Sequence, residues 1–258
     1  MNEERFSTIS HRRPMLRLER ASVDQEIVDF DREMKRALGD DAPFQYTVEP
    51  KIDGISVAMV YQGGILVTAA TIGDGYRGEL ITPNLKTILT VPLTLAALGD
   101  GKPVPDLLEV WGEVYMEVQA FEALNRDRVA GHLPPFPDPR AAAIDSLCRL
   151  NPRVTAKRPL NLFCYGVSEM SGPPEDTHYE LMVSIQGWGL RVNRPQRRLC
   201  ATIGEVIEKC HELQKTRTQF PYEIDGAVIK LNQLNLQAKL AERSRPPKWA
   251  IAYKFGPA

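Results

Sequence analysis

The chain has 258 residues, 43% of them hydrophobic and 25% charged, which excludes a disordered, fibrous or collagen-like protein and allows a sizeable core. Its 32 Lys and Arg residues and 33 Asp and Glu residues leave a formal net charge of -1, so no overall positive charge indicates nucleic-acid binding. The four cysteines lack the close Cys-x-x-Cys spacing of a structural zinc site, which predicts reduced thiols, no zinc and a cytoplasmic protein.

The first predicted element is a helix that begins with a capping box. Ser22 would cap this helix, and Gln25 follows three residues later. Apolar residues then recur at helical spacing until Gly39, namely Ile27, Phe30, Met34 and Leu38. This apolar face should pack against the segments that follow.

Alternating apolar and polar residues predict strands at 45–50, 55–61 and 65–71, with a hairpin closed by Gly63 and Gly64 and a second tight turn at Asp53 and Gly54. Further strands are expected at 107–116, 160–167 and 226–231, and helices near 118–129 and 203–214. The Pro-rich stretch 133–140 predicts a surface loop. The uncharged stretch 55–73 alternates like two strands, so it does not predict a membrane span.

Strands and helices without a regular βαβ rhythm favour an α+β fold with mostly antiparallel sheets. No repeat or low-complexity tract divides the chain. We therefore expect one domain over residues 1–258.

Lys51 lies on the tight connection between two apolar strands, within the sequence EPKIDG at 49–54. A nucleophilic lysine needs a lowered pKa, which partial burial and neighbouring cations provide, because only the free amine attacks. Lys230 and Lys254 also lie in strand-like sequence and would supply such cations. The alternative for each of the three is an ordinary exposed lysine.

Together with Glu113, these lysines form part of an ordered series of motifs. The chain resembles the adenylation domain of NAD-dependent DNA ligases from about His11 to Phe255. The motifs are KIDG (51–54), GDGYRGELITPN (73–84), WGEVYM (111–116), DPRAAAIDSL (138–147), RPLNLFCYG (158–166), PYEIDGAVIK (221–230) and WAIAYKF (249–255).

The resemblance implies a nucleotidyltransferase fold in which two mostly antiparallel sheets, with peripheral helices, flank a nucleotide cleft. It implies that Lys51 displaces nicotinamide mononucleotide (NMN) from NAD, carries AMP covalently and passes it to a DNA 5′-phosphate at a nick. Asp53 would order the turn beside this nucleophile. Asp225 is the carboxylate expected near a magnesium ion, which prefers oxygen ligands.

The resemblance also implies how the nucleotide is bound. Lys230 and Lys254 would hold the AMP phosphate, and their charge would help to keep Lys51 unprotonated. Glu49 would face the adenine amino group, and Glu113 would accept hydrogen bonds from the ribose hydroxyls. Arg217 aligns with a family arginine that faces phosphate.

Contacts with DNA are expected from Arg140, Arg245 and Lys248. The segment 138–148, a DNA-facing loop in the family, has lost two amides and one arginine and gained Asp138 and Asp145. Each lost phosphate contact should weaken DNA binding.

Two further departures concern the nucleotide site. Ile72 and Trp111 stand where the family usually has arginine. The sequence also shows no counterpart of the family's N-terminal NMN-binding subdomain or of its OB, zinc, helix-hairpin-helix and BRCT domains. We therefore expect a monomer with no membrane association whose nick sealing alone is impaired. The chain could be an excised domain or a stand-alone protein.

Two alternatives remain open at this stage. The chain could be a nucleotidyltransferase that uses another donor, such as ATP, or another acceptor. It could also be a non-catalytic nucleotide-binding or DNA-binding relative. Retention of Lys51, Glu113, Asp225, Lys230 and Lys254 argues against the second alternative.

Overall fold

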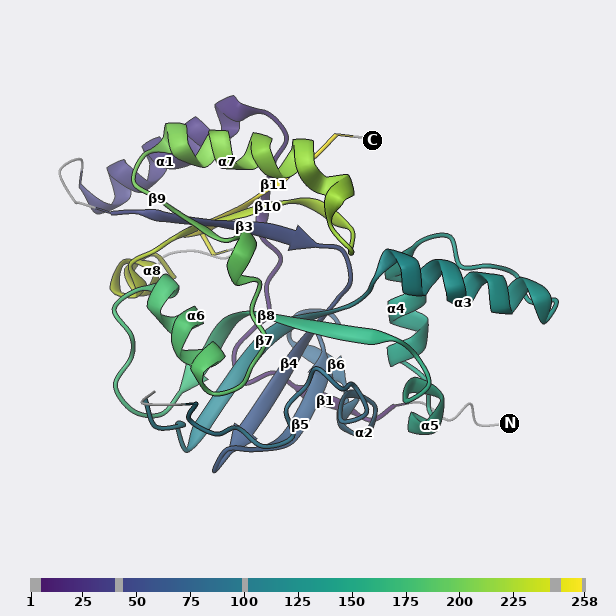
Figure 1. The fold of residues 1–258 in the computed structure, drawn as a ribbon. Helices are drawn as coiled ribbons and strands as arrows, with labels where there is room; N and C mark the ends of the chain where they lie inside the picture. The colour runs from purple at the N-terminus through teal and green to yellow at the C-terminus, as the bar shows by residue number, and fades with distance from the viewer. Residues whose placement is uncertain (1–5, 40–43, 99–101, 242–246, 257–258) are drawn as a thin grey trace.

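Two β-sheets carry the fold, and helices cover one face of each (Figure 1). The computed structural model describes residues 6–39, 44–98, 102–241 and 247–256. Arg245, predicted to contact DNA, lies outside these residues. Within the described part of the chain, no helix combines the length and apolar character needed to cross a membrane.

The first sheet has five strands in the order β2-β11-β10-β3-β9. Its strands are β2 (Glu19–Ala21), β3 (Tyr46–Ile52), β9 (Arg198–Cys200), β10 (Ile224–Leu231) and β11 (Ala250–Lys254). All neighbours pair antiparallel except β2 and β11, which are parallel. Helices α1 (Asp24–Leu38) and α7 (Ile203–Thr216) cover its outer face, seen at the top of Figure 1.

The alternation of β3 and β10 explains why these helices pack where they do. Val48 on β3 and Ile229 on β10 are paired and fully buried, and they share one core with Ile27 and Met34 of α1 and Val206 of α7. Because successive strand residues point to opposite faces, the intervening residues of β3 and β10 face the other sheet.

The second sheet is wholly antiparallel, in the order β5-β4-β7-β8. Its strands are β4 (Ile55–Gln62), β5 (Ile65–Thr71), β7 (Leu107–Met116) and β8 (Leu160–Met170). A short sheet of β1 (Thr8–Ser10) and β6 (Arg77–Glu79) lies beside it. The predicted hairpin between β4 and β5 is confirmed, with Gly63 and Gly64 at φ +53° and +76°, values that favour glycine.

Helices complete the covering of this second sheet (Figure 1). They are α2 (Thr82–Leu85), α4 (Pro139–Leu147), α5 (Pro152–Thr155) and α6 (His178–Gly187), while α3 (Val118–Ala130) projects outward. The remaining elements are α8 (Leu234–Ala241) and the 3-10 helices η1 (Arg194–Gln196) and η2 (Arg217–Gln219).

An aromatic cluster joins the two sheets. The Tyr115 and Phe163 rings, on neighbouring strands β7 and β8, stack with centroids 5.2 Å apart. Tyr222, just before β10, meets these rings edge-on at 5.2 and 5.6 Å. Such pairs contribute about 0.5–1.5 kcal/mol each beyond the area they bury. This cluster therefore fixes the spacing between the two sheets at one point.

The predicted α+β class with two mostly antiparallel sheets is confirmed. Strands β5 and β7 have the predicted bounds, and the other predicted strands are found with ends shifted by a few residues. The predicted helices at 118–129 and 203–214 are α3 and α7.

The predicted capping box at Ser22 and Gln25 is wrong. Helix α1 begins at Asp24 after Val23, whose side chain has no oxygen to cap the helix. The carboxylate of Glu26 instead accepts hydrogen bonds from the backbone N–H groups of Ser22 and Val23, at 2.5 and 3.2 Å. Glu26 thus accepts from the backbone at the start of α1, where the sequence predicted a capping box of Ser22 and Gln25.

The predicted loop at 133–140 and the loop assigned to 138–148 are also partly wrong. Helix α4 starts at Pro139, whose fixed φ suits the first helical position. Asp138 caps it by accepting from the backbone N–H of Ala141 at 2.6 Å. Arg140 therefore lies in the first turn of a helix.

The turn at Asp53 and Gly54 connects two sheets, because β3 and β4 belong to different ones. Lys51 lies inside β3, one residue before its end, and not on the connection itself. An added Cβ at Gly54 would overlap the carbonyl oxygen of Val114 on β7. A glycine is required there because the chain passes so close to β7.

Gly226 offers a test of the packing between β10 and β11. A Cβ at Gly226 would overlap the carbonyl oxygen of Tyr253, so we expect Gly226→Ala to lower the free energy of unfolding by about 1–3 kcal/mol. Urea unfolding followed by circular dichroism measures this change. Gly187→Ala is the matched control, because nothing lies within 4 Å of its added Cβ. Equal stability of both variants would contradict the close approach.

Candidate functional site

Strand register brings four of the predicted site residues to one face of the five-stranded sheet. Lys51 on β3 and Lys254 on β11 both lie opposite Gly226 on the central strand β10. Glu49 precedes Lys51 by two residues, and Lys230 follows Gly226 by four, so both share this face. The face points toward the four-stranded sheet, because the opposite face packs against α1 and α7.

Asp225 joins two of these lysines. Its carboxylate pairs with the ammonium of Lys254, and Lys51 Nζ lies 3.0 Å from its Oδ1. Partial burial acts to raise the pKa of Asp225, but the hydrogen bonds and charges of Lys254 and Lys51 outweigh it, so this pKa is lowered. The register of β3 and β10 shifts at Asp225, and such an irregularity re-aims a side chain. In this arrangement Lys51 is an ion-pair partner rather than a free amine.

Glu49 and Lys230 form a second and more deeply buried ion pair. Only 8% of Glu49 and 5% of Lys230 are exposed. The ammonium of Lys230 also donates to the carbonyl oxygen of Tyr165 on β8 at 2.7 Å, which ties the two sheets together. Burial acts to raise the pKa of Glu49, but Lys230 and His178 outweigh it and lower this pKa to about 2. Glu49 is therefore a permanent carboxylate at neutral pH.

Glu113 lies on β7 of the other sheet, opposite Ser56 on β4. The Ser56 hydroxyl donates to Glu113 Oε2 at 2.6 Å. Burial raises the pKa of Glu113 to about 7, although Ser56, Lys51 and Arg140 act in the opposite direction. Among the acids of this site, Glu113 is thus the one poised to change its charge near neutral pH.

The other predicted site residues have different surroundings. Arg140 Nη1 lies 2.8 Å from Asp53 Oδ1, so the start of α4 is joined to the connection after Lys51. Arg217 does not take part in the ion pairs of the site. Its Nη1 donates to the carbonyl oxygen of Gly256 at 2.9 Å, and it forms no ion pair with any described acid. Lys248 Nζ lies 3.8 Å from Oε2 of Glu33 on α1.

Three residues of this region were missed from the sequence, namely Ser56, Tyr165 and His178. Tyr165 lies within the quoted motif RPLNLFCYG, but no signal gave it a place beside Lys230. His178 Nε2 lies 3.4 Å from Lys230 Nζ although the two residues are 52 positions apart. Contacts across such separations leave no local pattern, so only the assembled sheets reveal them.

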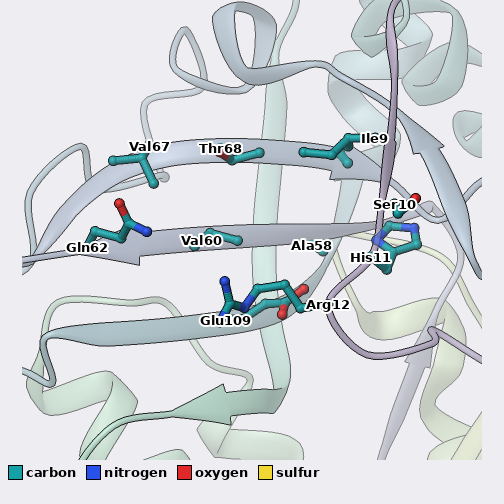
Figure 2. A pocket seen from close by; sticks show the side chains of 11 residues that line it. Ile9, Ser10, His11, Arg12, Ala58, Val60, Gln62, Val67, Thr68 and Glu109 are labelled. Carbon is teal, nitrogen blue, oxygen red and sulfur yellow. The ribbon is translucent and has the colours of Figure 1, made fainter.

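Two pockets lie beside the four-stranded sheet. The larger, of about 250 Å³, has Val60 and Thr68 on its floor, with His11 and Arg12 at one end and Glu109 below (Figure 2). The smaller, of about 120 Å³, is lined by segments 15–17 and 72–75, which places Ile72 next to the segment that crosses between the sheets. Neither pocket is lined by Lys51 or Glu113.

The site offers few ligands for a divalent cation. No three His, Cys, Asp or Glu side chains are grouped as ligands within the part of the chain that the structure describes. The carboxylate of Asp225 is already paired with Lys51 and Lys254. Magnesium usually keeps several waters and binds one or two carboxylates together with substrate phosphates. The side chains alone therefore do not build a magnesium site.

The family model described as the NAD-dependent DNA ligase adenylation domain matches residues 3–258. The chain is 45% identical over 252 residues to a DNA ligase of Syntrophotalea carbinolica, and 46% identical over 255 residues to one of Trichlorobacter lovleyi. Each match covers 98% of this chain but only 37% and 36% of those relatives. The chain thus spans little more than a third of their length.

The two ion pairs should differ in their effect on stability. Glu49→Ala leaves the buried ammonium of Lys230 without its carboxylate, so we expect it to lower the free energy of unfolding by about 3–5 kcal/mol. Asp225→Ala should cost about 1 kcal/mol or less, because Asp225 and its lysines remain partly in contact with solvent. Urea unfolding at pH 7 compares the two variants. A larger loss from Asp225→Ala would contradict this ranking.

Proposed function

The chain belongs to the family of NAD-dependent DNA ligase adenylation domains, and from this premise we propose that Lys51 takes AMP from NAD as a covalent adduct for transfer to a DNA 5′-phosphate at a nick. The observation that carries the proposal is the grouping of Lys51 with Asp225 and Lys254. A lysine beside a second cation and a shared carboxylate suits attack on a phosphorus that bears negative charge.

The first step needs the Lys51 amine to leave Asp225 and lose a proton to solvent. Its nitrogen then forms a bond to the α-phosphorus of NAD while the bond from that phosphorus to the NMN oxygen breaks. NMN leaves with the electron pair of that bond, and the second proton of the nitrogen passes to solvent. Lys254 remains paired with Asp225 when Lys51 departs, so the carboxylate keeps a counter-ion. Lys254 thereby stays next to the phosphate on which charge develops.

Glu49 and Lys230 are proposed to bind the adenine end of the nucleotide. Glu49 is a buried, ionised acceptor suited to an exocyclic amino group. Lys230 was expected to hold the phosphate, but its buried pair with Glu49 favours a place beside the base. Glu113, on the facing sheet, is proposed to accept from the ribose hydroxyls, and Asp53 to order the connection after Lys51 through Arg140.

Magnesium is proposed to be held mainly by the phosphates of the donor and by water, with Asp225 as its nearest carboxylate. When bound, it would supply positive charge that neutralises the phosphates. Arg217 is the further residue proposed to face phosphate.

Transfer to nicked DNA is proposed for the protein that contains this domain, because the chain spans about 37% of its ligase relatives. Arg140, Arg245 and Lys248 are proposed to contact the DNA backbone. Arg140 and Lys248 would first have to leave Asp53 and Glu33, so their contribution depends on exchanging one anion for another.

Intact-mass spectrometry tests the covalent step. After incubation with NAD and magnesium, we expect the chain to gain the mass of one AMP group, and Lys51→Ala to gain none. Parallel incubation with ATP identifies the donor. Lys86→Ala, at an exposed lysine next to α2, is the control and should form the adduct normally. An adduct that persists in Lys51→Ala would sink the assignment of the nucleophile.

The pH dependence of adenosine binding tests Glu113. Because its pKa is about 7, Glu113 is mostly protonated at pH 6 and mostly ionised at pH 8, and the ionised form is the better acceptor. We expect adenosine affinity to rise about three- to tenfold between these pH values. Adenosine has no group that titrates in this interval.

Glu113→Gln provides the matched comparison, because its amide does not titrate. We expect its adenosine affinity to be weaker than that of the unsubstituted chain at pH 8 and independent of pH. Calorimetric titration at four pH values measures both. An equal rise in the Gln variant would remove Glu113 from the ribose site.

A further inference from the structure

Glu109 is the buried acid of the larger pocket beside the four-stranded sheet, and the proposed function does not use it. It is 1% exposed, and its Oε2 has no hydrogen-bond partner among the described residues. Burial raises the pKa of Glu109, while Ser168, His11 and Arg12 act in the opposite direction. An ionised carboxylate is costly to bury without a partner, so a ligand that supplies a donor would stabilise it.

The acids at this place outnumber the cations that pair with them. Glu109 on β7 lies opposite Glu169 on β8. Arg12 binds Glu169 through two atoms of its guanidinium, Nε to Oε2 at 2.6 Å and Nη2 to Oε1 at 3.1 Å. This pair lowers the pKa of Glu169 and raises that of Arg12. Arg12 therefore neutralises Glu169, and within the described part of the chain no cation forms an ion pair with Glu109.

The shape of the pocket suits a slender ligand. Its volume is about 250 Å³, and Val60, directly opposite Glu109 in the pairing of β4 and β7, lies on its floor (Figure 2). Ala58 and Ala70, which are also paired, continue this floor. Such apolar side chains suit the methylene groups of a long cationic side chain. The volume is below the usual range of sites for drug-sized ligands, so it fits a single side chain or a small cation better.

This pocket is separate from the proposed nucleotide site. Glu109 precedes Glu113 by four residues on the same face of β7, which corresponds to about 13 Å along a strand. Neither Lys51 nor Glu49 nor Glu113 lines the pocket. A ligand bound beside Glu109 would therefore leave the contacts proposed for adenylate free.

We propose that this pocket binds a guanidinium carried on a slender apolar stem, as in an arginine side chain, with Glu109 as its counter-ion. The stem lies over Val60 and Thr68 on the floor. Because Oε2 of Glu109 has no hydrogen bond to lose, the carboxylate can turn toward the ligand. A guanidinium suits the pocket better than an ammonium, since it is more weakly hydrated and can donate to both carboxylate oxygens.

An NMR titration of the full chain tests the site, with N-butylguanidinium as the probe. We expect a dissociation constant on the order of 1 mM and shifts in the backbone amide signals of Val60, Thr68 and Glu109. N-butylurea has nearly the same shape without the charge, and we expect it not to bind. Saturation with AMP should leave the affinity for N-butylguanidinium unchanged. Competition by AMP, or shifts centred on Asp225, would place the cation in the nucleotide site and overturn the proposal.

Substitutions of the charged residues should change the affinity in opposite directions. Glu109→Gln should weaken binding about tenfold, because the amide keeps the shape of the side chain and loses its charge. Arg12→Gln should tighten binding about two- to fivefold, because Glu169 then adds a second unpaired carboxylate beside the pocket. Glu122→Gln, at an exposed acid of α3, is the control and should bind as the unsubstituted chain does.

Thermal unfolding checks that each variant is folded, and Glu109→Gln should fold because it removes a buried charge. Equal affinity of a folded Glu109→Gln variant and the unsubstituted chain would overturn the role of Glu109. No binding of N-butylguanidinium to the unsubstituted chain would overturn the site itself.

The guanidinium could belong to a free small molecule or to an arginine of a polypeptide. N-acetyl-arginine methylamide, which has a peptide bond on each side of the arginine, distinguishes these sources. Tighter binding of this compound than of N-butylguanidinium would identify an arginine of a polypeptide, and weaker binding would identify a free small cation.

Discussion

Charge balance on the face between the two sheets is the constraint on which the rest of the site depends. Lys51, Lys230 and Lys254 all point from the five-stranded sheet toward the other sheet, where water is scarce around Lys230. A buried ammonium is tolerated only when it is paired and hydrogen-bonded. Glu49 and Asp225 supply the pairing, and the Tyr165 carbonyl and His178 complete the bonds of Lys230. These acids therefore organise three cations into two units, a deeply buried one beside His178 and a more accessible one that contains Lys51.

The passage of the chain from β3 to β4 sets where the second sheet meets these units. Lys51 lies one residue before the end of β3, and Ser56 is the second residue of β4. Gly54 between them passes so close to Val114 that no side chain fits. This close approach brings Glu113, which is hydrogen-bonded to Ser56, within electrostatic range of Lys51. The aromatic contacts among Tyr115, Phe163 and Tyr222 hold the same spacing next to Glu113, because Tyr115 follows Glu113 by two residues on the same face of β7.

The sequence predicted the strands well because their alternation is local, and its ordered motifs led to the expectation that Lys230 and Lys254 supply cations near Lys51. It could not predict that Asp225 bridges Lys51 and Lys254, because Asp225 is 174 positions from Lys51 and 29 positions from Lys254 in the chain. Helix α4 was mistaken for a loop because its proline was interpreted as a breaker, although proline is well suited to a first helical turn. The cap of α1 was assigned to Ser22 because serine is a preferred capping residue. The longer side chain of Glu26 instead reaches the backbone N–H groups before the helix. The neighbours of His178 depend on Asn232 and β10, which no local pattern around His178 encodes.

Two acidic residues that depart from the family pattern, Asp138 and Asp145, have local partners in the structure. Asp138 and Asp145 add negative charge to a segment that the resemblance assigns to a DNA-facing loop. Asp138 instead caps α4, and Asp145 pairs with Arg149 one turn later on the same segment. A carboxylate that accepts from a helix N-terminus, or that faces a guanidinium, presents less negative charge to a phosphate than a free one does. The repulsion is therefore smaller than the substitutions alone suggest. For the proposed contact with DNA, the larger effect should come from Arg140, because its contact with Asp53 must break before it can reach a phosphate.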